Sequence, residues 1–195
     1  MFAKSAQLIS KKEHLTEEGL KKLVVIRASI NQGLSELLRT SFPSCIPVEK
    51  PQFTREADNL HPQWLAGFTS GEGYFGVKFL KSSTIKTGVQ VKLIFQITQH
   101  IRDEMLMKSL ENYFGCGKFS ISTRGGYGDF QVGKFSDITG IIIPFFQNNK
   151  IEGVKSEDFK DWCKIVMIMK DKHHLTLKGL EQIKTLRSSM NKGRY

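Results

Sequence analysis

The sequence repeats part of itself at a separation of 160 residues, and this repeat limits the possible folds more than any other feature. Residues 2–33 align with residues 162–193, and eleven of the aligned positions are identical. The matched core is HLTxxGL, which begins at His14 and again at His174. Two copies this far apart indicate a duplicated domain, because the units of a solenoid recur every ~20–50 residues.

Each copy is predicted to form two helices joined at a Leu-Thr turn, with Thr16 or Thr176 as N-cap of the second helix. Apolar residues follow helical spacing in both second helices: Leu20, Leu23, Ile26 and Ile30, and Leu180, Ile183, Leu186 and Met190. Convergence of two unrelated helical hairpins is the alternative, but the identities include residues of surface type that packing does not dictate. The recurrence of His14 as His174 favours a structural role for this histidine over metal binding.

The two copies differ in what precedes them. The second copy closes a unit that begins near residue 59, whereas the first copy begins almost at Met1. We therefore expect residues 1–40 to be a helical remnant of a first domain and residues 59–195 to be a complete second domain. Residues 41–58 contain Pro43, Pro47 and Pro51 and are predicted to be an extended linker.

The second unit is predicted to have an α+β fold. Helices are expected at 62–73, 102–114, 136–146, 156–172 and 176–191, and strands at 74–81, 88–98, 117–122 and 129–134. Pro62 suits the first helical position, and Gly115 is expected to end the second helix. The order is αββαββα with an extra terminal helix, which predicts an antiparallel four-stranded sheet.

Alternation along the predicted strands separates an apolar face from a polar one. Phe75, Val77 and Phe79 alternate with Tyr74, Gly76 and Lys78; Val91, Leu93 and Phe95 alternate with Gln90, Lys92 and Ile94; Phe119 and Ile121 alternate with Lys118, Ser120 and Ser122. Helices are expected to cover the apolar face. The polar face is suited to contacting bases and phosphates in a DNA groove, although an ordinary solvated face is an equally good explanation of the pattern alone.

The net charge of +10 is spread along the chain and favours a polyanionic partner. Nucleic acid is the better candidate, and an anionic membrane is the weaker one. The longest apolar run, residues 141–146, is broken by Pro144 and is too short to span a bilayer, so no membrane association is expected. Three widely separated cysteines lack the spacing of a zinc site and fit a reducing compartment.

The segment LAGFTSGEG, residues 65–73, contains the most unusual helix of the chain. Ala66, Gly67, Ser70 and Gly71 leave one helix side nearly bare, which permits close packing against another helix. Without a partner, each glycine would only destabilise the helix, by about 1 kcal/mol relative to Ala. We therefore expect another backbone to approach this side of the helix.

Glu72 is unusual because an acid in the last helical turn faces the negative end of the helix dipole, at a typical cost of about 0.3–1 kcal/mol. A divalent cation held by Glu72, nearby carbonyls and DNA phosphates would offset this cost. For an isolated helix, an ordinary surface glutamate before Gly73 would be the simpler explanation.

LAGFTSGEG resembles the LAGLIDADG motif of homing endonucleases, with identity at Leu65, Ala66, Gly67 and Gly73 and with Glu72 at the position of the family's metal-binding acid. The resemblance extends over residues 59–195 through the αββαββα order, FQITQH, VGKFSD, GVKSEDF and MNKGR. It is strongest to the single-chain, two-domain subgroup from introns of fungal mitochondria. In that family two motif helices pack together at the centre of a DNA-binding saddle, and each provides one acid.

The resemblance implies roles for individual residues. Glu72 and the carbonyl of Gly71 would bind Mg²⁺ or another divalent cation, Gln99 would order water beside the scissile phosphate, and Lys134 would stabilise charge on the phosphate or activate water. Residues implied to contact DNA are Tyr74, Gly76, Lys78, Leu80, Lys92, Lys118, Ser120 and Gln131.

The resemblance also implies a double-stranded DNA target, expression in a mitochondrion, and a second motif helix, which residues 1–58 do not contain. That helix would come from a missing first domain or from a second copy of the chain. The expected activity is metal-dependent hydrolysis that makes a double-strand break for intron homing. The alternatives are an RNA-splicing maturase that binds intron RNA, a non-catalytic DNA-binding remnant, and an inactive fragment.

Overall fold

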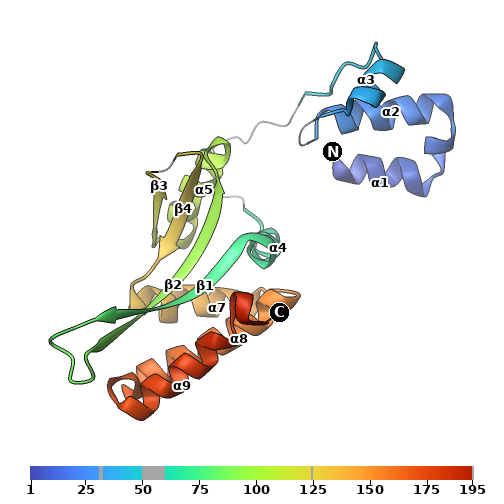
Figure 1. Ribbon diagram of the computed structural model, residues 1–195. Coiled ribbons are helices and arrows are strands. Elements are labelled where there is room, and N and C mark those ends of the chain that lie inside the picture. Colours follow the sequence, from blue (N-terminus) through green and yellow to red (C-terminus); the bar gives the residue numbers. More distant parts are fainter. Residues whose placement is uncertain (31–32, 50–59, 124, 195) are drawn as a thin grey trace. The chain divides into compact units, whose positions relative to one another are not determined.

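The computed structural model describes residues 1–30, 33–49, 60–123 and 125–194. The chain divides into two compact units, Met1–Gln52 and Phe53–Tyr195, which we call unit 1 and unit 2 and describe separately (Figure 1). Residues 50–58 of the expected linker and Asn31 of the repeat lie outside the described residues.

Unit 1 is helical. It contains α1 (Phe2–Ser10), the 3₁₀ turn η1 (Glu13–Leu15), α2 (Glu17–Ala28) and α3 (Glu36–Ser41). The Thr16 hydroxyl oxygen accepts a hydrogen bond from the Gly19 backbone N–H at 3.1 Å, which confirms Thr16 as the N-cap of α2.

The second copy of the repeat has the same local structure in unit 2. It consists of α8 (Val154–Lys170), η5 (His173–Leu175) and α9 (Leu177–Ser188). Thr176 accepts a hydrogen bond from the Gly179 N–H at 3.1 Å, and Lys172 has a φ of 59° where Lys12 of the first copy has 57°. The predicted helix pairs and their N-caps are therefore confirmed in both copies.

Unit 2 is built on an antiparallel sheet with the strand order β1-β2-β4-β3. The motif helix α4 (Pro62–Glu72) leads directly into β1 (Gly73–Lys81), which forms a long hairpin with β2 (Val89–His100) (Figure 1). The short turn η3 (Ile101–Asp103) and α5 (Glu104–Phe114) follow, and Gly115 ends α5 with a φ of 62°. The second hairpin pairs β3 (Lys118–Ile121) with β4 (Tyr127–Val132).

The core of unit 2 lies between one face of the sheet and the helices. Phe75 of β1, Phe95 of β2 and Phe130 of β4 lie on this face and are fully buried, as is Trp162 of α8. The Phe75 and Trp162 ring centroids are 5.2 Å apart. The predicted division into a buried apolar face and an opposite polar face is thus confirmed for the main part of the sheet.

Three details differ from the sequence-based expectation. The fourth strand covers 127–132 and not 129–134, so Lys134 follows the strand and precedes α6 (Phe135–Asp137). Ile121, expected on the buried face, is 53% exposed because it ends the outer strand β3. The helix expected at 136–146 contains a π-helical segment, η4 (Ile138–Ile142), before α7 (Ile143–Asn148), where Pro144 has no N–H to continue an α-helical ladder. A last 3₁₀ turn, η6 (Asn191–Arg194), follows α9.

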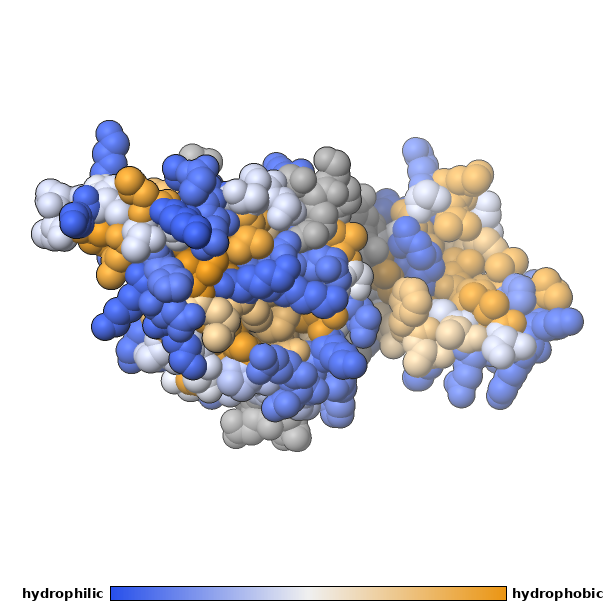
Figure 2. Space-filling model, turned by 90° about the horizontal axis from the view of Figure 1, so that it is seen from below, coloured by the Kyte–Doolittle hydropathy of each residue, from blue (hydrophilic) through white to orange (hydrophobic). Residues whose placement is uncertain are grey.

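The face seen in Figure 2 carries many hydrophilic side chains with hydrophobic patches between them. Among the described residues, no helix combines the length and the apolar character that crossing a bilayer requires.

Candidate active site and nucleic-acid interface

Helix α4 leaves one of its sides open within unit 2. His61 Nδ1 accepts a hydrogen bond from the Gln63 N–H at 3.2 Å, so the helix begins at Pro62 as predicted. A Cβ placed on Gly67 or Gly71 would meet nothing within 4 Å. Trp64, one turn before these glycines, is 44% exposed and stacks on Phe68. This side therefore carries bare backbone next to an exposed aromatic ring.

The other two residues predicted for a helix interface face the body of unit 2. Ala66 is buried, and the Ser70 hydroxyl donates to the Ala66 carbonyl at 2.8 Å. The same hydroxyl oxygen accepts a hydrogen bond from the Glu152 backbone N–H at 3.0 Å. Only Gly67 and Gly71 of the predicted set thus lie on the open side.

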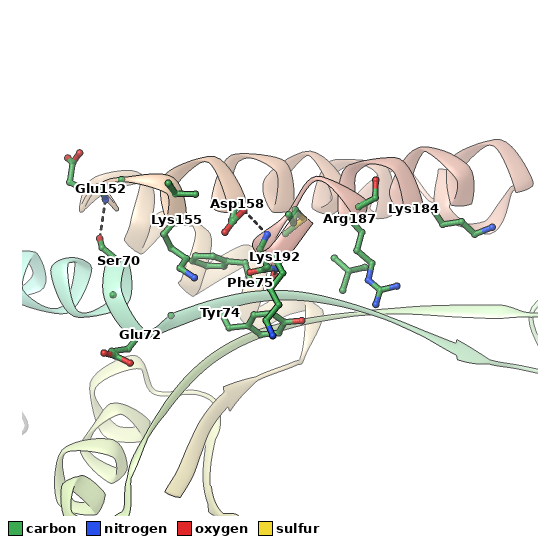
Figure 3. A pocket seen from close by; sticks show the side chains of 18 of the residues that line it. Ser70, Glu72, Tyr74, Phe75, Glu152, Lys155, Asp158, Lys184, Arg187 and Lys192 are labelled. Carbon is green, nitrogen blue, oxygen red and sulfur yellow. Dashed lines mark hydrogen bonds between the residues drawn. The ribbon is translucent and has the colours of Figure 1, made fainter. Parts of the chain in front are cut away.

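Glu72 ends α4 with an exposed side chain, and among the described residues it forms no ion pair. It lines a cleft of about 920 Å³ between the start of β1 and the helices α8 and α9 (Figure 3). The cations of the cleft are Lys155, Lys184, Arg187 and Lys192, and its other carboxylates are Glu152 and Asp158. Glu72 thus shares a cleft with four cationic side chains.

Gln99 and Lys134 lie at opposite ends of the β2–β4 pairing. Gln99 pairs with Gly128, whereas Lys134 comes two residues after Val132, which pairs with Phe95. This register separates the two by roughly 20 Å along the strands. Glu72 directly precedes Gly73, whose partner on β2 is Ile97, so it lies toward the Gln99 end. Lys134 instead forms an ion pair with Asp137 at 3.5 Å.

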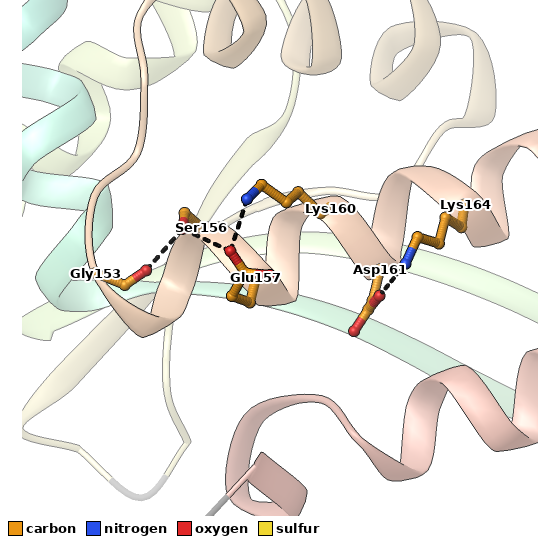
Figure 4. A network of polar contacts seen from close by, with 6 residues as sticks. All are labelled: Gly153, Ser156, Glu157, Lys160, Asp161 and Lys164. Carbon is orange, nitrogen blue, oxygen red and sulfur yellow. Dashed lines mark hydrogen bonds and ion pairs between the residues drawn. The ribbon is translucent and has the colours of Figure 1, made fainter.

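Lys155, which the sequence reasoning did not single out, lines the same cleft as Glu72. It lies in the first turn of α8, which starts after Gly153 at a φ of 68°. The Ser156 hydroxyl donates to the Gly153 carbonyl at 2.7 Å, and Lys160 pairs with Glu157 at 2.6 Å (Figure 4). These contacts fix the turn that presents Lys155. The segment GVKSEDF could have indicated this lysine, because a glycine at a helix start places the residue two positions later in the first turn of the helix.

Most residues predicted to contact DNA share the polar face of the sheet. Tyr74, Lys78, Leu80, Lys92, Lys118 and Ser120 are exposed and Gln131 is half-buried. Gly76 differs, because it is buried and a Cβ there would lie 2.4 Å from the Tyr74 ring. Its carbonyl accepts a hydrogen bond from Trp162 Nε1 at 3.0 Å. Gly76 therefore makes room for Tyr74 on this face and is itself covered.

A hydrogen-bond network that the sequence reasoning missed runs across the centre of the polar face. The Gln96 amide donates to Thr98 Oγ1 and to Asp129 Oδ1, both at 2.9 Å. Thr98 donates to the same Asp129 oxygen at 2.6 Å, and the Gln131 amide donates to Gln96 Oε1 at 2.9 Å. The network fixes the orientation of the two side-chain amides, so that their N–H and C=O groups are not interchangeable. The sequence could have indicated this network, because strand alternation places Gln96 and Thr98 on the same face of β2 as Lys92.

Within the described part of the chain, no cluster of three or more His, Cys, Asp or Glu side chains could hold a metal. Glu72 by itself provides a single carboxylate, so a complete metal site at its side chain needs further ligands.

The motif helix and the antiparallel four-stranded sheet with one polar, lysine-bearing face define an α+β protein. The chain belongs to the LAGLIDADG endonuclease family, whose sequence model matches residues 65–166.

The chain is similar to curated fungal proteins over most of its own length. "Probable intron-encoded endonuclease 3" of Neurospora crassa is 40% identical over 95% of this chain and 35% of the relative. An "Uncharacterized 50.9 kDa protein in ND4 intron 1" of Podospora anserina is 27% identical over 73% of this chain and 32% of the relative. The chain thus spans about a third of the length of these two relatives.

Among solved structures, the I-SmaMI LAGLIDADG homing endonuclease bound to cleaved DNA matches with a TM-score of 0.80 and 50% identity, over 100% of this chain and 64% of that chain. I-SmaMI has also been solved bound to an uncleaved DNA target in the presence of calcium ions.

Proposed function

We propose that the chain is the DNA-binding half, with one catalytic acid, of a site-specific homing endonuclease. The supporting observation is the position of Glu72. Glu72 is exposed at the end of α4, directly before β1, and it lines the lysine-bearing cleft. The reaction would be phosphodiester hydrolysis in double-stranded DNA, giving one cut of a double-strand break.

Mg²⁺ or another divalent cation is the proposed cofactor, and the residues of the chain fit such an ion. Glu72 offers a hard carboxylate oxygen and the Gly71 carbonyl a second oxygen, while Mg²⁺ commonly takes one or two carboxylates plus phosphate oxygens and water. When bound, the ion would activate water and polarise the phosphate. The calcium ions in an I-SmaMI complex support a divalent-ion site in a relative.

The side chains around Glu72 then have separate tasks. Lys155, on the same cleft as Glu72, would offset negative charge on the phosphate during hydrolysis. Gln99, at the same end of β2, would orient water through its amide. Lys134 stays a prediction for the charge-stabilising role, and its position past the other end of β4 makes Lys155 the better candidate.

DNA recognition is assigned to the polar face of the sheet. Lys78 and Lys92 are paired across β1 and β2, and exposed lysines of this kind contact phosphates. Both N–H groups of Gln96 are used within the network, whereas Gln131 keeps one N–H and its carbonyl oxygen for a base edge. Gln131 would therefore contact a base, since glutamine can bond an adenine in the major groove through two atoms.

The missing partner of α4 is proposed to be a first LAGLIDADG domain, of which unit 1 is the helical end. Phe2 is 83% exposed where its counterpart Trp162 is fully buried, and Leu20 is 44% exposed where Leu180 is 4% exposed. A groove of about 680 Å³ with apolar residues such as Leu8 and Val25 also opens on unit 1. These positions would be covered by the sheet of that domain. A second copy of the chain, joined through α4, is the alternative source of the second acid.

Expression in a mitochondrion is proposed because a relative is encoded in an intron of ND4, a mitochondrial gene. In the part of the chain that the structure describes, no feature favours the RNA-splicing alternative.

The test is cleavage of a supercoiled plasmid library of candidate targets in Mg²⁺ by the chain and by its Glu72→Gln variant, with single-strand nicks scored as well as double-strand breaks, because one acid would serve one cut. Glu152→Gln is the matched control, because Glu152 is an exposed acid of the same cleft. We expect cleavage to be lost by at least a hundredfold in Glu72→Gln and retained in Glu152→Gln. Equal cleavage by all three proteins would refute the assignment of the acid, and binding of intron RNA without any cleavage would favour the maturase.

A further inference from the structure

We propose that Arg187 and Lys192 form a phosphate-binding site at the open edge of β1, which holds the DNA backbone as it leaves the polar face of the sheet. This site lies outside the residues predicted from the sequence, and it rests on the proposed function only for the identity of its ligand. Its geometry follows from three features of the cleft.

The cleft reaches around the edge of the sheet. β1 is an outer strand, so no further strand of the sheet covers its free side. Tyr74, on the polar face, and Phe75 and Phe79, on the opposite face, all line the same cleft. A DNA strand that crosses the polar face and leaves it over β1 therefore comes directly to the cations of the cleft.

Arg187 is held at the cleft wall with its guanidinium 5.3 Å from the centre of the Phe79 ring. Stacking on an aromatic face leaves the in-plane N–H groups available, and their fork matches two phosphate oxygens. The equivalent arginine of the first copy is used differently. Arg27 donates to the carbonyls of Ile30 at 3.0 Å and Gly33 at 2.6 Å, so it closes the end of its own helix.

Lys192 is placed by the residue before it. The Asn191 backbone N–H donates to the buried Asp158 carboxylate at 2.9 Å, and its side-chain amide donates to the Phe75 carbonyl at 3.2 Å. Asn191 has a φ of 54°, a left-handed conformation that asparagine tolerates better than most residues. The turn is therefore anchored to both α8 and β1, and the Lys192 side chain extends toward Tyr74 (Figure 3).

The charges favour an anion at this end of the cleft. Lys184 pairs with Glu181 at 3.2 Å, whereas neither Arg187 nor Lys192 forms an ion pair among the described residues. Two cations from the segment α9–η6, beside a sheet face that carries Lys78 and Lys92, suit the regularly spaced phosphates of one DNA strand. An acidic protein segment lacks this continuity with the sheet face and is the alternative occupant.

The first measurement is the salt dependence of duplex DNA binding by the full chain, in Ca²⁺ and with a target duplex. Removing two phosphate contacts should lower the slope of log K against log[salt] by about 2. We expect this loss for Arg187→Gln/Lys192→Gln and about half of it for Lys192→Gln alone. Lys170→Gln/Lys178→Gln removes the same charge from exposed positions of α8 and α9 outside the cleft, and it should leave the slope nearly unchanged. Lys192→Gln changes an exposed side chain, so it tests the site even if the double variant unfolds.

The second measurement is a ¹⁵N NMR titration of the full chain with the phosphodiester dinucleotide dTpdT, read at Arg187 Nε and the Lys192 amide. Shifts there without duplex binding would support the phosphate site and contradict the proposed endonuclease. Duplex binding and cleavage with an unchanged slope in the double variant would overturn the site and leave the endonuclease standing. Shifts induced by a poly-glutamate peptide but not by dTpdT would assign the cleft to an acidic protein segment and also overturn the proposal.

Discussion

The helix pair α1–α2 of unit 1 and the helix pair α8–α9 of unit 2 have nearly the same internal structure and different surroundings. A Cβ at Gly19 would lie 1.9 Å from the Glu13 carbonyl oxygen, and one at Gly179 would lie 2.0 Å from the His173 carbonyl oxygen. Within unit 2, α8–α9 packs on the sheet and Trp162 is fully buried, whereas the described residues of unit 1 form helices alone and Phe2 is exposed. The turn and caps are thus encoded within some thirty residues, whereas burial depends on a partner element.

The largest predicted difference between the copies concerns this burial. Trp162→Ala should destabilise unit 2 by about 3–5 kcal/mol, because it leaves a cavity and removes the hydrogen bond that the indole N–H donates to the Gly76 carbonyl. Phe2→Ala should change stability by no more than about 0.5 kcal/mol. Urea unfolding followed by circular dichroism measures both. A large loss for Phe2→Ala would mean that α1 is already packed on an apolar surface in this chain.

The second comparison concerns the tight glycine of each turn. Gly179→Ala should destabilise unit 2 by about 1–3 kcal/mol, because the added methyl group collides with the backbone of His173, which cannot move without opening η5. Gly19→Ala should open the turn of unit 1 in the same way, seen as faster tryptic cleavage at Lys21 and Lys22. Gly140→Ala, which would meet nothing within 4 Å, is the control. Tolerance of Ala at Gly179 would contradict a shared, locally encoded turn.

The third comparison concerns the N-caps. Thr176→Ala should cost about 1 kcal/mol, because the Gly179 N–H loses its acceptor at the start of α9. Thr16→Ala should cost a similar amount in α2, and Thr→Ser at either position should be nearly neutral. Thermal unfolding of the four variants provides the measurement. A cap that matters in only one copy would show that the surroundings, and not the local sequence, stabilise the turn.

The smallest effect is a pH dependence at His174. Burial lowers the pKa of this imidazole, although the carbonyls of Ile168 and Met169 act in the opposite direction. The unfolded chain then binds more protons than the folded one, so the contribution to stability is present above about pH 6.5 and decreases as the pH falls below it. His174→Gln should flatten this dependence and His173→Gln, at an exposed neighbour, should not. Equal slopes in all three proteins would rule out His174 as the titrating group.

The sequence predicted the helices of the repeat, the two hairpins and the position of Glu72 in the last turn of α4 because these depend on local signals. Caps, period-two alternation and the glycines of α4 all lie within a few residues of one another. The register of the second hairpin was less well determined, since several glycines at 125–128 allow more than one turn, and β4 begins two residues early. The exposure of Ile121 could not be predicted, because it depends on the place of β3 at the edge of the sheet.

The site was predicted less completely than the fold. Lys155 and Lys192 come from segments 80 or more residues away from Glu72 in the sequence, and only the packing of α8 and α9 beside β1 brings them to one cleft. The role of Lys134 rests on a short motif, which contains no information on strand register, and it stays a prediction. A residue's distance from Glu72 is set by tertiary structure, and one sequence contains no direct record of it.

The most direct test of the central claim is paramagnetic broadening of the amide signals of the full chain by Mn²⁺ in the presence of a target duplex. This measurement asks whether Glu72 holds a metal without requiring the second acid. We predict broadening centred on residues 71–74 that is lost in Glu72→Gln and retained in Glu152→Gln. Broadening that persists unchanged in Glu72→Gln, or that is centred elsewhere, would contradict the account.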